Sequence, residues 1–137
     1  MKTLAKFAIL VVLATAASGP TAFGQSEPIR ATIPFSFNAG GTWLEAGTYV
    51  VKLENGQVFR LMNEQGRTKV LTLSNAVIDK NRNGRSRLIF NRYGDRHFLS
   101  SVFWDGYMHG RELPMSTAEI EIAKRVRPSE RIAVQLR

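Results

Sequence analysis

Four polar side chains in the second half of the chain could together hold a metal ion. Asp95 and His97 lie two positions apart in a predicted strand, so both should project from the same face. His109 and Glu112 follow in a segment without clear periodicity, with Asp105 nearby. Two histidines and a carboxylate suit zinc or iron with an open coordination position. The spacing matches no established metal motif, so ordinary surface polar residues are the simpler interpretation.

A second group of residues could bind an anion. Four cations lie within the eight positions from 80 to 87, in and just after the polar segment 79–86: Lys80, Arg82, Arg85 and Arg87. Their attraction to phosphate, sulfate or carboxylate would weaken strongly with salt. Two aromatic residues in predicted loops, Trp43 and Tyr107, could stack on a sugar or lie at a lipid boundary. A solvated hairpin tip is the alternative interpretation of the basic segment.

Signatures of several catalytic classes are missing from the sequence. It contains no Gly-x-Ser-x-Gly nucleophile elbow and no phosphate-binding glycine loop. The chain also has no cysteine, which excludes thiol catalysis and cysteine-ligated zinc. We therefore expect a non-catalytic binding or structural protein without a cofactor. Two alternatives stay open, a small secreted metal-dependent hydrolase and a lipid carrier that holds an apolar ligand inside its fold.

Residues 1–24 are expected to form a cleavable export signal. Lys2 and Lys6 make the start positive, and residues 7–17 form an apolar run. Ala22 and Gly24 then place small side chains at the two positions that a signal peptidase recognises. The apolar run is shorter than the roughly 20 residues that a membrane-spanning helix needs. We therefore expect a soluble mature protein, secreted or periplasmic, that begins at Gln25 and has no transmembrane helix.

The part of the chain after the predicted signal has the size of one domain, residues 25–137. Without disulfides it must depend on packing and backbone pairing. Two of the 19 basic residues lie in the signal, which leaves 17 against 11 acidic residues and a net charge of +6. Outside the cytoplasm this charge could attract an anionic envelope glycan or lipopolysaccharide, while cytoplasmic nucleic acid is not expected as a partner. A charge that only keeps the domain in solution is the plainer interpretation.

Alternation of apolar and polar residues predicts half-buried strands along most of this domain. Residues 29–37 contain Pro34, which lacks a backbone N–H and therefore favours an edge strand or a break. Asn55-Gly56 readily adopts a type I′ turn and should join residues 48–54 to residues 57–63. The further predicted strands are residues 69–76, residues 87–93 and 96–104 around a Gly94-Asp95 turn, and the tail from residue 132 to 136.

One helix should interrupt the strands at about residues 116–126. Ser116 can cap its start, and Glu119 can reach back to close a capping box. Four apolar residues form a stripe at helical spacing, and these are Met115, Ala118, Ile122 and Val126. The whole pattern predicts one mostly β domain, an antiparallel β-sandwich or a small flattened barrel with a single helix.

Three stretches of the chain resemble a family of small exported proteins that is numerous in soil acidobacteria and has no assigned activity. They are residues 33–37 with residues 44–49, residues 90–99, and residues 110–119. Members of that family usually have Leu-Pro-Ala-Gly where this chain has Leu-Glu-Ala-Gly, with Glu45 in place of the proline. The resemblance implies an exported, mostly β protein, and it brings no catalytic residue, cofactor or substrate.

Overall fold

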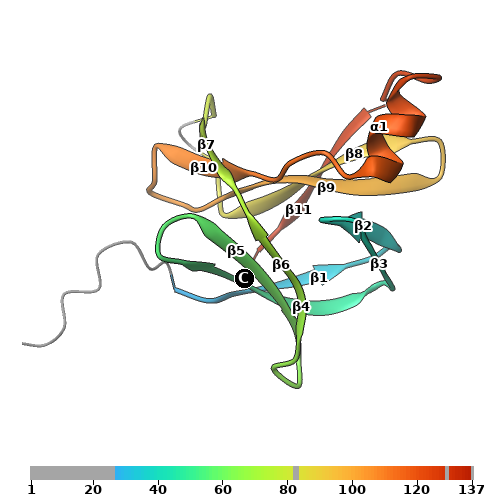
Figure 1. Cartoon of the computed structure of the whole chain (residues 1–137). Coiled ribbons are helices and arrows are strands. Elements are labelled where there is room, and N and C mark those ends of the chain that lie inside the picture. Colours follow the sequence, from blue (N-terminus) through green and yellow to red (C-terminus); the bar gives the residue numbers. More distant parts are fainter. Residues whose placement is uncertain (1–26, 82–83, 129, 137) are drawn as a thin grey trace, which may run out of the picture.

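The protein is described here from a computed structural model, which covers residues 27–81, 84–128 and 130–136. The predicted signal and the expected start at Gln25 lie outside the described residues. Within them the chain forms two β-sheets and one short helix, with the sheets stacked in a sandwich (Figure 1). The mostly β prediction is therefore confirmed in its sandwich form. None of the helices in the described part is long and apolar enough to cross a bilayer.

The first sheet contains four antiparallel strands in the order β1-β4-β5-β6. Their bounds are Ile29–Ile33 for β1, Gly47–Glu54 for β4, Val58–Asn63 for β5 and Thr68–Leu73 for β6. β4 and β5 form a hairpin around Asn55-Gly56, where both residues have positive φ angles of 50° and 71°. The predicted pairing of residues 48–54 with residues 57–63 is therefore confirmed.

The second sheet contains seven strands, five of them in the order β11-β8-β9-β10-β7. The other two form the β2–β3 hairpin, which joins the sheet because β2 runs parallel to β9. The bounds are Phe37–Ala39 for β2, Thr42–Leu44 for β3, Asn75–Ile78 for β7, Arg87–Tyr93 for β8, Arg96–Phe103 for β9, His109–Glu112 for β10 and Glu130–Gln135 for β11. The Gly94 turn and the strand in the C-terminal tail were both predicted, and both are confirmed.

Pro34 divides the first predicted strand between the two sheets. β1 ends at Ile33 and lies at the edge of the first sheet, while β2 begins at Phe37 and belongs to the second sheet. A proline cannot donate to a strand ladder, so both the edge position and the break follow from its chemistry. The prediction made from Pro34 is confirmed.

The prediction of one strand over residues 69–76 was wrong, because the chain changes sheets at Ser74. β6 ends one residue before Ser74 and β7 begins one residue after it. The backbone N and the Oγ of Ser74 donate to the carbonyl oxygen of Gln57 at 2.9 and 2.7 Å. The Arg111 guanidinium donates to the Oγ and the carbonyl oxygen of Ser74 from the other sheet. These long-range contacts hold a corner that alternation along the chain does not reveal.

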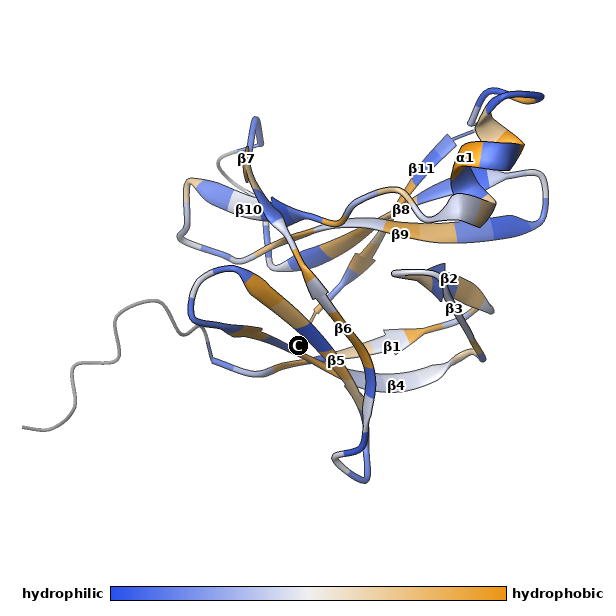
Figure 2. Ribbon diagram, viewed as in Figure 1, coloured by the Kyte–Doolittle hydropathy of each residue, from blue (hydrophilic) through white to orange (hydrophobic). Residues whose placement is uncertain are grey.

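An apolar core fills the space between the sheets. Hydrophobic and hydrophilic residues alternate along the strands, which places one set of side chains inside (Figure 2). The largest fully buried apolar side chains of this core are Phe37, Phe59, Phe90, Ile33, Leu61 and Leu88. The protein's own side chains therefore occupy the interior. This is the space in which a lipid carrier would hold its apolar ligand.

The helix α1, Thr117–Ala123, is shorter than predicted and is fastened to the sheet by a buried carboxylate. Ser116 caps it as expected, since its Oγ accepts a hydrogen bond from the N–H of Glu119 at 3.2 Å. The Glu119 side chain, 3 % exposed, does not turn back to the cap but accepts hydrogen bonds from Asn91 and Tyr93 at 3.0 and 3.2 Å. The capping-box role of Glu119 is therefore replaced by an anchor to β8.

Candidate functional site

The structure does not bring the candidate metal ligands together. Glu112 lies opposite Ser101 on β9, four positions from His97, a separation of roughly 13 Å along the strand. The His97 ring stacks on Phe35 with ring centroids 3.8 Å apart. His109 is exposed at the other end of β10, while Asp95 and Asp105 are exposed in turns. Within the described ranges no group of three or more His, Cys, Asp or Glu side chains could hold a metal ion.

The basic segment contains a buried ion pair. Arg87 donates to both carboxylate oxygens of Asp79, with Nη2–Oδ1 at 2.7 Å and Nη1–Oδ2 at 3.2 Å. The two side chains are 11 % and 6 % exposed. Hydrogen bonding from Arg87 holds the pKa of Asp79 below its ordinary value, although burial acts in the opposite direction. Arg87 was expected to be a surface cation, and the structure instead places it inside with its charge neutralised.

The remaining predicted contact residues lie in separate places. Lys80 and Arg85 are exposed, and Arg82 lies outside the described residues. Trp43 and Tyr107 are exposed as expected, although Trp43 belongs to the strand β3 and not to a loop. They line different pockets, so they do not form one aromatic surface.

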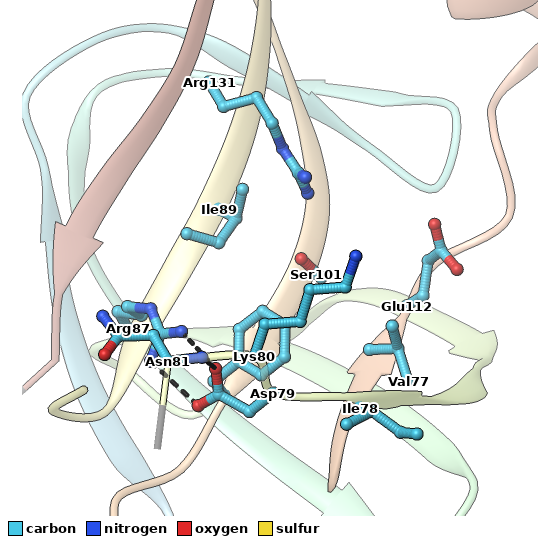
Figure 3. A pocket seen from close by; sticks show the side chains of 11 residues that line it. Val77, Ile78, Asp79, Lys80, Asn81, Arg87, Ile89, Ser101, Glu112 and Arg131 are labelled. Atoms are coloured by element: carbon cyan, nitrogen blue, oxygen red, sulfur yellow. Dashed lines mark hydrogen bonds and ion pairs between the residues drawn. The ribbon is translucent and has the colours of Figure 1, made fainter. Parts of the chain in front are cut away.

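An open pocket of about 460 Å³ lies on the outer face of the second sheet, beside the segment that follows β7 (Figure 3). Ile89, Ser101 and Phe103 form its floor, on the opposite side of β8 and β9 from the core residues. Ile89 pairs with Ser101, and Ser101 pairs with Glu112 on β10. Residues paired across antiparallel strands project from the same face, which explains why these side chains meet.

Two features of the floor are held in place by their neighbours. The Arg87 guanidinium lies 4.6 Å from the centroid of the Phe103 ring, so the ion pair with Asp79 also positions this ring. Gly110 leaves the space that the ring occupies, because a Cβ at this position would lie 2.4 Å from the ring. Ser101 is 2 % exposed, and its hydroxyl has no hydrogen-bond partner among the described residues.

Three charged side chains surround the floor, each from a different element. Lys80 follows β7, Arg131 belongs to β11 and Glu112 ends β10. In Figure 3 the Arg131 and Lys80 side chains reach toward the space above Ser101, and Glu112 stands away from Arg131. Within the described part of the chain, neither Lys80 nor Arg131 forms an ion pair. This arrangement can attract an anion to a mostly apolar surface.

Sequence reasoning identified only part of this pocket. Lys80 was recognised from its basic neighbours, whereas Arg131 was not, because 51 positions separate the two residues. The antiparallel pairing of β11 with β8 brings Arg131 to the pocket. Ser101 and Phe103 lie in the predicted strand 96–104, where they alternate with core residues.

Comparisons of the chain with models of protein families, with curated proteins and with solved structures gave no match. The resemblance of three stretches to exported acidobacterial proteins therefore stays a prediction.

Proposed function

We propose that the protein is an exported, non-catalytic binding protein of the cell envelope or extracellular matrix. Its ligand is anionic, such as an acidic glycan or lipopolysaccharide, and a terminal group of this ligand occupies the pocket on the second sheet. The observation that carries the proposal is the convergence of Lys80 and Arg131 over an apolar floor. Export depends on the predicted signal in residues 1–24.

The two cations complement each other chemically. Arg131 offers a planar guanidinium that can bind a carboxylate or phosphate through two parallel hydrogen bonds, while Lys80 supplies a compact charge on a flexible stem. Both side chains are exposed, so salt should weaken their attraction to an anion. The volume of about 460 Å³ is typical of sites for small molecules or for one terminal group of a larger ligand.

A binding role agrees better with this pocket than the alternative of a metal-dependent hydrolase. Neither His97 nor His109 lines the pocket, so no imidazole faces Ser101 to act as a general base. Metal analysis of the purified protein addresses the alternative directly. One equivalent of zinc or iron would favour the hydrolase over our proposal.

The proposal predicts salt-dependent retention of the mature protein on immobilised lipopolysaccharide or polygalacturonate. Raising the ionic strength from 10 to 150 mM shortens the screening length from about 30 to about 8 Å, so retention should fall. The double variant Lys80→Met/Arg131→Met should weaken binding at least about tenfold, since it removes two charged contacts. The matched double variant Lys69→Met/Arg125→Met, which removes two exposed cations outside this pocket, should bind like the unmodified protein.

Two results would contradict this proposal. Absence of retention at 10 mM salt on both matrices would show that the protein does not bind an anionic ligand of this kind. An equal loss in the two double variants would show that net charge, and not the pocket, drives the binding.

A further inference from the structure

We infer that the ligand of this pocket is a zwitterion, in which a protonated amine accompanies the anionic group. Glu112 binds the amine, while Lys80 and Arg131 bind the anion. This inference rests on the proposed function and names the chemical class of its ligand. It follows from the placement of one carboxylate at the edge of a pocket that otherwise favours anions.

Glu112 is available to a ligand. Its side chain is exposed, lines the pocket and forms no ion pair among the described residues. The adjacent cation, Arg111, does not compensate it, because the Arg111 guanidinium is engaged with Ser74 at the corner between β6 and β7. Among the described residues, no cation therefore pairs with the Glu112 carboxylate beside the pocket.

The opposite charges are separated by the floor. β11, which carries Arg131, and β10, which carries Glu112, are three strand positions apart in the sheet. At about 4.8 Å per strand, their axes lie roughly 14 Å from each other. Lys80 and Glu112 also form no ion pair in the described structure, although both line the pocket. The positive and negative ends thus remain free for the two ends of one small molecule.

The charge pattern selects against ligands with a single charge. A pure anion is attracted by Lys80 and Arg131 but repelled by Glu112. A pure amine is repelled by the two cations. The floor of Ile89 and Phe103 excludes part of the water, which strengthens each of these interactions. A dipolar molecule that lies with an apolar face on this floor satisfies all three side chains.

Calorimetric titration of the mature protein with matched sugars tests this inference. Muramic acid carries an amine and a carboxylate, whereas N-acetylmuramic acid keeps the carboxylate and lacks the charged amine. We expect muramic acid to bind about tenfold more tightly, as one charge-assisted contact distinguishes the two. Glucosamine and glucuronic acid, with one charge each, should bind more weakly than muramic acid.

The variant Glu112→Gln separates charge from size. The acetyl group also adds bulk, but a preference caused by bulk would survive in Glu112→Gln, whereas a preference caused by charge should disappear. N-acetylmuramic acid should bind this variant at least as tightly as it binds the unmodified protein. Glu121→Gln on the exposed side of α1 is the control and should keep the full preference. Circular dichroism checks that each variant is folded.

The outcomes distinguish this inference from the proposed function. If muramic acid and N-acetylmuramic acid bind equally, or if Glu112→Gln keeps a tenfold preference, the assignment of a zwitterion is wrong, while an anion-binding pocket stands. If no acid in the panel binds and retention on acidic matrices is also absent, the proposed function is wrong as well.

Discussion

The ion pair between Asp79 and Arg87 should be the most sensitive polar contact of the fold. Replacing Arg87 with methionine keeps most of the volume of the side chain but leaves a buried carboxylate without its partner. Breaking a buried pair in this way costs about 3–5 kcal/mol. The pair borders an open pocket, where water can reach part of it, so we expect the lower end, about 3 kcal/mol. For a domain with a free energy of unfolding on the order of 5–15 kcal/mol, this loss is large.

Urea denaturation followed by tryptophan fluorescence measures this loss. The double variant Asp79→Leu/Arg87→Met should recover part of it, because removing both charges leaves no unpaired group. The single variant should also weaken ligand binding, since Arg87 stacks on the Phe103 ring that forms the pocket floor. A loss below about 1 kcal/mol for Arg87→Met at neutral pH would refute our view that the pair is buried and stabilising.

The pH dependence of stability provides a second readout of the same pair. The pKa of Asp79 is lowered in the folded protein, mainly by hydrogen bonding from Arg87. Its contribution to stability is therefore present above the unfolded pKa, about 3.9, and is lost as the pH falls through the lower folded pKa. In Arg87→Met, burial without a partner should raise this pKa. Acidification should then first protonate Asp79 and remove the cost of burying its unpaired charge. The same pH slope in both proteins would contradict this account.

Three further predictions concern the outer face of the second sheet. Glu119→Ala should lower the free energy of unfolding by about 2 kcal/mol, because it leaves buried hydrogen-bond donors on β8 unpaired. Burial and the Glu119 carboxylate raise the pKa of Tyr93 to about 12, so spectrophotometric titration of Glu119→Gln should show a lower tyrosine pKa. Gly110→Ala should destabilise the protein by about 1–3 kcal/mol in thermal unfolding, since the added methyl group collides with the Phe103 ring; an unchanged Tm would disprove this contact.

Much of the local structure could be predicted from the sequence. The hairpin at Asn55-Gly56, the turn at Gly94, the break at Pro34 and the cap at Ser116 all occur where they were expected. Each depends on the backbone preferences of one or two residues, which the chemistry of those residues determines without help from distant parts of the chain. Alternation likewise separated the buried from the half-buried positions along β4, whereas both faces of β9 are buried from Phe98 to Phe103.

The candidate site could be predicted only in part. Lys80 and the segment around it stood out as basic, and Glu112 stood out as a carboxylate, but each was assigned to a different kind of site. The structure places them in one pocket, because β7 and β10 are neighbours in the sheet. The charge of Arg87 was visible in the sequence, whereas its burial against Asp79 was not.

The amino-acid pattern by itself therefore determined that the described chain is mostly β, where several of its turns fall and which side of a strand such as β4 is apolar. Tertiary structure alone decided the corner at Ser74, the anchoring of α1 through Glu119 and the meeting of Lys80 with Arg131. The physical reason is the range of the interactions. A turn is set by residues next to each other, while strand order and pocket composition are set by packing and hydrogen bonds between segments far apart in the chain.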